Sequence, residues 1–416
     1  MSSSQNTNVG SMAQSSGLDR QSSPGARATK TELARSSNRT LIVLYAVACA
    51  LFWASLYLYI PTLPVYAASR TSNLAMVGVV LSMYGLWQAV IRLPLGIMAD
   101  WVGRRKPFII AGIGFAALGA LTMGRAQGIP GLIVGRAFTG FAASVWVLLV
   151  VAFSGLFPPE DAVRAAAILT SVNSVARMLA TSITGTLNAA GGYPLAFYVA
   201  AGLAGMAMLV MLLVREPRRE IAAPSFQQVG TLITRRDVLL PALLGVVLQY
   251  AVWASTFGFT QNLAQSLGAT DVVLSLLMSM NIGLVFVGNL TTSAIVRRIG
   301  SRAMLALSFF FIALGLGLLA LARGLPMVFA AQILLGLSSG VGYPVLMGLS
   351  IRYVDDKHRA TAMGLFQSVY AVGMFGGPWI SGILADAISI QPMFALTAVV
   401  CAVLGLTGTR LLRARQ

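Results

Sequence analysis

Three arginines lie inside long apolar stretches of this sequence, and they are the residues best suited to act on a bound solute. Arg92, Arg136 and Arg177 are each flanked by apolar residues on both sides. A charge inside a bilayer costs at least about 2.5–3.5 kcal/mol, so such residues generally face the interior of a helix bundle. For Arg136 and Arg177 two interpretations stay open. They take part in function, or they pair with helix carbonyls and polar neighbours such as Asn173.

Aromatic and neutral polar residues in the same apolar stretches could line a cavity beside these arginines. They are Trp53, Tyr57, Trp146, Trp253, Asn281, Gln332, Tyr343 and Gln367. The arginines would give such a cavity a positive bias, which suits an anionic solute or a neutral amphipathic one. The alternative is that the aromatic side chains pack within the protein or face lipid.

No arrangement of residues in the sequence predicts catalysis. There is no metal-ligand spacing and no phosphate-binding Gly-x-x-x-x-Gly-Lys-Ser/Thr loop. We therefore expect no enzyme activity, no metal or other cofactor, and no ATP hydrolysis by this chain.

The composition indicates a membrane protein. Of the 416 residues, 57% are hydrophobic and only 10% are charged, whereas a soluble protein carries about 25% charged residues. Each helical span of a bilayer needs roughly 20 apolar residues, and the chain supplies such runs repeatedly. A transmembrane barrel is excluded because its strands alternate apolar and polar residues over about 10 positions. The net charge of +17 does not indicate nucleic-acid binding, because the basic residues stand at the ends of apolar runs.

Twelve membrane spans are predicted. Six lie near 40–66, 74–99, 107–124, 131–153, 164–188 and 193–214, and six near 239–262, 272–296, 302–322, 326–351, 360–385 and 392–412. The predicted domains are a disordered cytoplasmic tail (1–39), two six-helix bundles (40–214 and 239–412), a cytoplasmic linker (215–238) and a cytoplasmic C-terminal tail (413–416). The fold class is thus an all-α membrane protein.

The distribution of Lys and Arg predicts the orientation. With the N-terminus inside, only Arg70, Arg125 and Arg323 fall on the outer side, and the other bases outside the spans fall on the inner side. Cytoplasmic loops carry the excess of positive charge. Both termini are therefore expected in the cytoplasm, and the protein in the plasma (inner) membrane.

The two bundles repeat each other. Trp53-Ala54-Ser55 corresponds to Trp253-Ala254-Ser255 at an offset of 200, and Gly103 corresponds to Gly300 at 197. Arg136-x-x-x-Gly140 corresponds to Gln332-x-x-x-Gly336 at 196, and Arg164-Ala165 to Arg359-Ala360 at 195. Matches in order at nearly constant offset indicate a duplicated six-helix unit. Units with an even number of spans are related by an axis along the membrane normal.

A Gly–Asp–Gly–basic cluster follows the second span. It comprises Gly96, Asp100, Gly103, Arg104 and Arg105. The pattern Gly-x-x-x-Asp-x-x-Gly-Arg-Arg resembles the signature loop of major facilitator superfamily transporters. The fourth span carries Arg136, Gly140 and Ala143, which resemble a second signature of that family.

The resemblance implies that this loop is a gate. Asp100 would pair with nearby arginines and lock the two bundles together on the inside, while Gly96 and Gly103 would allow a close helix approach and a tight turn. The other interpretation is a charge cluster that only sets topology. Trp101 departs from the family, which commonly has a base there, and the second copy (Arg297, Arg298, Gly300 and Arg302) has no acid.

Gly377 and Pro378 in the eleventh span predict a helix bend, as moving transporter helices use. The glycine–proline motif that drug antiporters carry in the fifth span is absent there. None of the twelve acidic residues lies in the middle of a span. Proton-coupled exporters of cations usually need such a carboxylate, so transport of that kind is disfavoured.

The resulting functional prediction is a secondary transporter that works by alternating access. Family resemblance favours efflux of a small molecule or drug by proton-coupled antiport. A first alternative is movement of an organic anion or neutral metabolite, uptake included. A second, of another class, is a lipid scramblase or membrane sensor. The expected partners are a small-molecule substrate and the lipid bilayer, with no nucleic acid, and the protein is expected to act as a monomer.

Overall fold

A computed structural model describes residues 24–214, 216, 234–355 and 359–412 of the chain. The chain divides into two units, Met1–Thr40 and Leu41–Gln416. Helix α1 (Pro24–Tyr57) begins in the first unit, and all other helices belong to the second. The described residues contain no strand, which confirms the predicted all-α class.

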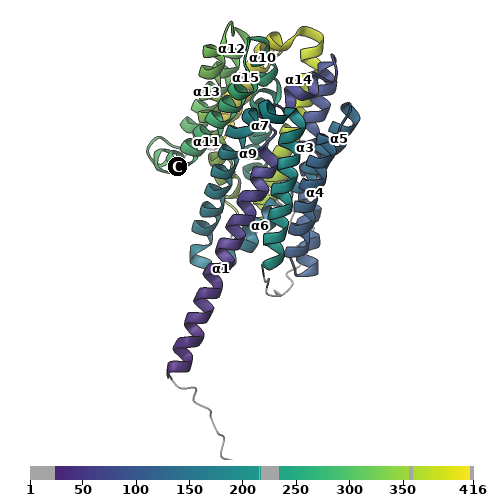
Figure 1. Cartoon of the computed structure of the whole chain (residues 1–416). Helices are drawn as coiled ribbons and strands as arrows, with labels where there is room; N and C mark the ends of the chain where they lie inside the picture. The colour runs from purple at the N-terminus through teal and green to yellow at the C-terminus, as the bar shows by residue number, and fades with distance from the viewer. Residues whose placement is uncertain (1–23, 215, 217–233, 356–358, 413–416) are drawn as a thin grey trace, which may run out of the picture. The chain divides into compact units, whose positions relative to one another are not determined.

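The helices of the second unit form two consecutive sets. We call residues 41–214 the N-terminal half and residues 236–412 the C-terminal half. After α1, the N-terminal half contains α2 (Leu63–Ala68), α3 (Leu74–Val102), α4 (Lys106–Gly124), α5 (Ile129–Ala143), α6 (Trp146–Ser154), η1 (Pro159–Asp161) and α7 (Ala162–Leu213). The C-terminal half contains α9 (Arg236–Ala254), the π-helical turn η2 (Ser255–Phe259), α10 (Thr260–Ser266), α11 (Asp271–Ile299), α12 (Ser301–Ala320), α13 (Leu325–Ile351), α14 (Arg359–Ile388) and α15 (Ile390–Leu411). Figure 1 labels most of them and shows them running side by side.

Twelve spans follow from these helices. Eleven helical stretches in the described residues are long and apolar enough to cross a membrane, and one of them, Arg164–Leu213, has 50 residues. At 1.5 Å per residue, 50 residues would extend about 75 Å, far more than a bilayer core of about 30 Å. Gly191 and Gly192 have non-helical backbone angles within this stretch and divide it into two spans. The twelve-helix prediction is confirmed.

The first helix starts earlier than the sequence predicted. Residues 1–23 of the predicted tail lie outside the described residues, but α1 begins at Pro24. Helix-favouring residues such as Ala28, Glu32 and Ala34 extend the helix of the first span. The structure thus places residues 24–39 in α1, where the sequence analysis expected a tail without regular structure. Most of the predicted linker (217–233) and the tail at 413–416 also lie outside the described residues.

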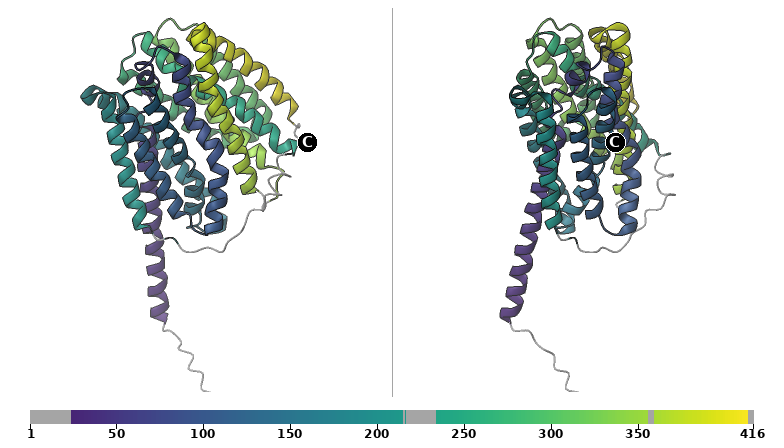
Figure 2. Two further views of the ribbon diagram at one scale, coloured as in Figure 1. Left: turned by 90° about the vertical axis from the view of Figure 1, so that its right-hand side faces the viewer. Right: turned by 45° about the vertical axis from the view of Figure 1, so that its right-hand side comes forward.

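The repeat is visible in the helix packing. In the N-terminal half α4 packs against α5, and α3 against α5; in the C-terminal half α12 packs against α13, and α11 against α13. Both copies of Trp-Ala-Ser lie at a break in their helix, since α1 ends at Tyr57, two residues after the first copy, and α9 ends at Ala254, within the second. The left view of Figure 2 shows the two halves beside each other, the N-terminal half in blue to teal and the C-terminal half in green to yellow.

The halves meet along two helix pairs, α3 with α14 and α7 with α11. Glycines bring the backbones together in both pairs. A Cβ atom added to Gly78 would overlap the backbone oxygen of Pro378, and one added to Gly185 would overlap the backbone of Asp271. Small residues allow such close approach between membrane helices.

Hydrogen bonds between the halves gather at one end of the bundle. We call the end that carries Arg104, Arg105 and Arg298 the basic end. At the opposite end the backbone N–H of Leu74 donates to Asp386 (2.9 Å), and Asn188 donates to Asp271 (2.9 Å). Going towards the basic end, the last such bond among the described residues is from Arg92 to the Tyr370 hydroxyl (3.2 Å). The halves are therefore joined at the opposite end and the middle.

We expect Gly78→Ala to destabilise the protein. The added methyl group would push α3 away from the Pro378 carbonyl and Gly382, and overpacking of this kind costs about 1–3 kcal/mol. Thermal unfolding of the purified protein in detergent would measure the loss. Gly317→Ala is the matched control, because a Cβ atom there meets no atom within 4 Å. Equal melting temperatures for the two variants would contradict the close packing.

Candidate substrate-binding site

Aromatic side chains from both halves form one cluster in the middle of the bundle. We call it the aromatic cluster: Trp53 and Tyr57 of α1, Tyr84 of α3, Trp146 of α6, Trp253 of α9 and Phe257 of η2. Within the N-terminal half, the ring centroids of Trp53 and Trp146 lie 5.4 Å apart and those of Trp53 and Tyr57 lie 5.8 Å apart. The interpretation of these aromatic residues as lipid-facing is wrong for Trp53, Tyr57 and Trp253, which are buried.

The cluster crosses the junction between the halves at two places. Tyr84 stacks on Trp253 with centroids 5.1 Å apart, and Tyr57 meets Phe257 edge-on at 6.1 Å. Trp53 and Trp253 belong to the repeated Trp-Ala-Ser motif, and Tyr57 and Phe257 each lie four residues further on. The two copies of this motif therefore bring their aromatic residues together at the junction between the halves.

Two of the predicted arginines lie against the rings of this cluster. The guanidinium of Arg136 lies over Tyr84, 4.3 Å from the ring centroid. That of Arg177 lies 3.9 Å from the Tyr57 centroid and 5.9 Å from that of Trp53. A cation over an aromatic face gains about 2 kcal/mol or more when it is removed from water. The rings thus stabilise the positive charges inside the bundle.

Several donors at this place have no acceptor in the described part of the chain. They are Nε and Nη1 of Arg136, Nε of Arg177 and Nε1 of Trp53. Arg136 is 2% exposed, so water does not readily replace the missing partners. A buried donor without an acceptor costs about 1–3 kcal/mol, and more when it is charged. An acceptor-rich group bound here would satisfy these donors.

Arg92 lies apart from the aromatic cluster. It donates to Tyr370 of α14 and to the side-chain oxygen of Gln88, one turn earlier in α3. The Tyr370 ring meets that of Tyr343 at 5.6 Å. Arg92 therefore bridges the two halves, and Tyr343 packs next to that bridge.

Neutral polar residues form a second group in the C-terminal half. Asn281 donates to the side-chain oxygen of Gln332 at 2.8 Å and to its backbone oxygen at 3.0 Å. Thr256 donates to the same side-chain oxygen at 3.1 Å. The side-chain nitrogen of Gln332 is buried without a partner in the described residues, and so is the side-chain oxygen of Gln367, which belongs to α14. The sequence analysis named Asn281 and Gln332 as separate candidates; their direct pairing is a finding of the structure, because 51 residues separate them in the chain.

The repeat relates these two groups. Tyr84 and Asn281 are separated by the offset of 197 that relates α3 to α11, and Arg136 and Gln332 by 196. A Cβ atom on Gly140 would overlap the backbone of Tyr84. One on Gly336 would lie 3.0 Å from the backbone oxygen of Asn281. The same packing thus holds a cation over a ring in one half and an amide pair in the other.

The predicted gate loop joins α3 to α4. Gly103 ends α3 with φ 66°, which confirms the predicted tight turn. Asp100 forms an ion pair with Arg105 at 3.2 Å, within the loop itself, and Arg104 is exposed. Among the described residues Asp100 therefore has no ion pair with the C-terminal half, so the predicted lock is not seen in the present conformation.

Glu216 is a residue of this loop's network that the sequence analysis missed. Its carboxylate accepts from the backbone N–H groups of Arg105 (2.9 Å) and Lys106 (2.8 Å) at the start of α4. In return, the Lys106 ammonium donates to the carbonyls of Leu212 and Val214 at the end of α7. Each charge complements a helix dipole. The only signal in the sequence was an acid directly after the sixth span.

The prediction for Gly96 needs correction, and that for Gly377 stays open. A Cβ atom on Gly96 would meet no atom within 4 Å, so the predicted close approach does not occur there in this conformation. Helix α14 continues through Pro378, and Gly377 instead lets it approach the Tyr250 carbonyl of α9. The helix does not end at Gly377 and Pro378, and the predicted bend there stays a prediction.

We expect Tyr84→Leu to lower the free energy of unfolding by about 2 kcal/mol, because Arg136 loses the ring beneath it. Tyr84→Phe keeps the ring and removes only the hydroxyl, so its stability should stay close to that of the wild type. Thermal unfolding of the two purified variants would compare them. If both lost the same stability, the hydroxyl rather than the ring would be the important group.

Comparison with known proteins agrees with this architecture. Tetracycline resistance protein, class C, of Escherichia coli is 26% identical over 369 residues, which cover 83% of this chain and 89% of that protein. An uncharacterized MFS-type transporter of Methanocaldococcus jannaschii is 21% identical over 368 residues, covering 83% and 91%. The crystal structure of a mutant of the nucleoside transporter NupG has a similar fold, with a TM-score of 0.79 at 16% identity over 90% of this chain and 100% of that one.

The family assignment rests on a broader match. The sequence model of the Major Facilitator Superfamily matches residues 45–260 and again residues 242–416. The two matches together cover most of the chain and correspond to its two halves. This chain belongs to the major facilitator superfamily of multi-pass membrane transporters.

Proposed function

We propose that this protein is a secondary transporter that moves a small organic anion by alternating access. The observation that carries the proposal is the pair of guanidinium groups, Arg136 and Arg177, that lie against aromatic rings at the centre of the bundle. Their free donors suit a carboxylate, phosphate or sulfonate, and the rings suit an aromatic or apolar body. A cation would be repelled at this place.

The charge balance of the centre supports an anionic substrate. The acidic residues of the N-terminal half lie near helix ends, as do Asp271 and Asp386 in the C-terminal half. Among the described residues, the one ion pair joins Asp100 to Arg105 at the basic end. No acid in the described part of the chain therefore pairs with Arg136 or Arg177, and a bound anion would neutralise their charge.

The contacts between the halves support alternating access. They join the halves at the end opposite the basic loops, and Gly96 near the basic end has open space around it. By the positive-inside rule the basic end lies in the cytoplasm, with both termini there and the protein in the plasma (inner) membrane as a monomer. In this orientation the conformation is closed to the outside, and the aromatic cluster would be reached from the cytoplasm.

Export of a drug-like molecule is the second candidate. It is favoured by the relative of 26% identity that is named for tetracycline resistance. An exporter that loads from the cytoplasm would bind its substrate in the conformation observed here. Proton-coupled antiport belongs to this candidate and would require a proton carrier other than a mid-span carboxylate, since the sequence has none. Comparing import and export in vesicles of known orientation would separate the two directions.

We expect Arg177→Gln to reduce transport of anionic solutes by about tenfold or more, because a charge-assisted hydrogen bond contributes about 1.5–3 kcal/mol. Uptake into proteoliposomes would be measured for a panel of aromatic carboxylates and their neutral amides. The neutral amides should be affected much less. Arg125→Gln removes the same charge from an exposed position and is the matched control. Equal loss for acids and amides would contradict the proposed role.

We expect Asp100→Asn to favour the conformation that is open at the basic end. To close that end, the loop must meet the C-terminal half, and Asp100 is the acid of this loop that can pair with a base there. A thiol introduced by Gly96→Cys would report the opening through its labelling rate with an impermeant reagent added from the basic side. The native Cys49 and Cys401 are buried. If adding Asp100→Asn left the labelling rate of the introduced thiol unchanged, the proposed gate would be contradicted. Glu160→Gln is the control for loss of an exposed acid.

A further inference from the structure

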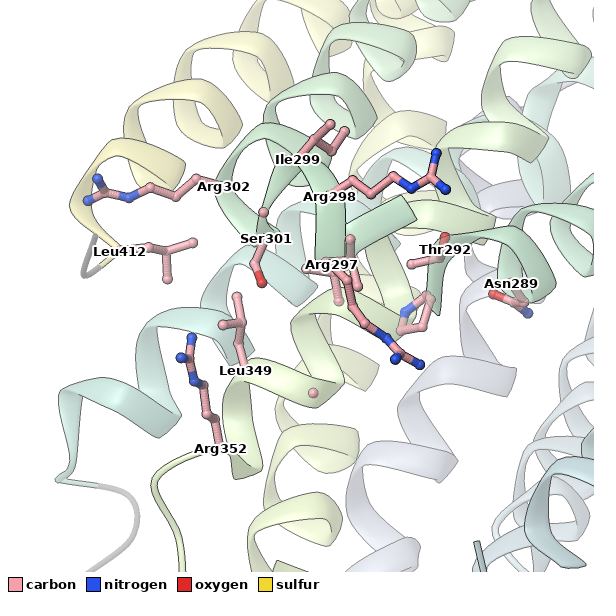
Figure 3. Close-up of a pocket in the computed structure, with 15 residues that line it drawn as sticks. Asn289, Thr292, Arg297, Arg298, Ile299, Ser301, Arg302, Leu349, Arg352 and Leu412 are labelled. Carbon is pink, nitrogen blue, oxygen red and sulfur yellow. The ribbon is translucent and has the colours of Figure 1, made fainter. Parts of the chain in front are cut away.

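A cavity bordered by arginines lies at the basic end of the C-terminal half. It has a volume of about 590 Å³ and lies between the end of α11, the start of α12 and the last turns of α13. Its lining includes Arg297, Arg298, Arg302 and Arg352, and no acid is among the described residues that line it. Figure 3 shows Arg297 and Arg298 towards Thr292, and Arg302 and Arg352 on the side of Leu412. The aromatic cluster shares no residue with this cavity.

The repeat shows what the same place contains in the N-terminal half. By the offset of 197, the counterparts of Arg297 and Arg302 are Asp100 and Arg105, which form the ion pair of 3.2 Å. The start of α4 is capped there by the carboxylate of Glu216. In the N-terminal half, two carboxylates of the protein therefore neutralise the basic loop.

The C-terminal half has the bases without those carboxylates. Arginine stands at 297 where the first copy has Asp100, and the sequence from Leu412 to Gln416, which follows the last span, contains no acid. The start of α12 has no side-chain cap. Glu216 binds two backbone N–H groups at the start of α4. The equivalent N–H groups at the start of α12 are those of Arg302 and Ala303. Arg297 and Arg298 have no hydrogen bond or ion pair with the described residues.

From this comparison we infer that the cavity binds a phosphate group, supplied in the membrane by the headgroup of an anionic phospholipid. Free N–H groups at a helix N-terminus bind phosphate, and the surrounding arginines would pair with its oxygens. Basic pockets between membrane helices on the cytoplasmic side are suited to anionic headgroups. The apolar side chains of Val296, Leu349 and Leu412 in the same lining suit the adjoining glycerol and acyl chains. The lipid phosphate would take the place that Glu216 has in the other half.

The inference is tested by thermal unfolding of the full chain in detergent, with dioctanoyl phosphatidylglycerol, dioctanoyl phosphatidylcholine or inorganic phosphate added. Phosphatidylglycerol should raise the melting temperature by several degrees more than phosphatidylcholine. If inorganic phosphate matched phosphatidylglycerol at equal concentration, the phosphate site would stand and its source would be soluble. If neither phosphatidylglycerol nor phosphate exceeded phosphatidylcholine, the inference would be overturned.

Matched variants locate the effect. The double substitution Arg297→Gln and Arg298→Gln should weaken the lipid response about tenfold or more in concentration. Arg104→Gln combined with Arg125→Gln removes the same charge elsewhere and should keep the response. An equal loss in both pairs would indicate general surface charge and would overturn the site.

The substitution Arg297→Asp supplies the acid that the repeat lacks. It should pair with Arg302 as Asp100 pairs with Arg105, so the protein should melt at a higher temperature without lipid and lose its response to phosphatidylglycerol. A variant that still responded like the wild type would refute the equivalence of the two loops. Because this readout is stability and not transport, it fails or succeeds independently of the proposed substrate.

Discussion

The main energetic constraint at the centre of this protein is the cost of holding guanidinium groups inside an apolar bundle without carboxylate partners. Arg136 and Arg177 are stabilised by the faces of Tyr84 and Tyr57, which offer a negative potential but no hydrogen-bond acceptor in the plane of the guanidinium. This solution leaves N–H donors free. A carboxylate of the protein would satisfy them permanently, whereas the rings leave them available, as the proposed binding of an anion requires.

The second feature of the molecule is a symmetric backbone with asymmetric charge. Equivalent helices pack through equivalent glycines in the two halves, yet the pair of Arg136 and Tyr84 corresponds to the pair of Gln332 and Asn281. The halves also differ in charge at the basic end. There Asp100 and Glu216 neutralise the N-terminal loop, whereas the C-terminal loop is not neutralised in this way. The two halves thus share their backbone packing and differ in the charged and polar side chains that it positions.

The junction between the halves combines close packing with few hydrogen bonds. Glycines bring α3 to α14 and α7 to α11, while the hydrogen bonds that cross the junction lie at the opposite end and the middle. Each neutral hydrogen bond contributes only about 0.5–1.5 kcal/mol. A junction of this kind can therefore open at one end when new contacts form at the other, which is the energetic balance that alternating access requires.

The sequence by itself determined the spans, the basic end, the repeat and the presence of arginines inside the bundle, because each depends on local composition and on the cost of charge in a bilayer. Tertiary structure decided the partners. Tyr84 carried no signal in an apolar helix, and Glu216 lies far along the chain from the Lys106 N–H that it caps. The open space at Gly96 differed from the sequence prediction for the same reason. Which groups meet depends on how the helices pack and on which end of the bundle is closed, and local sequence encodes neither.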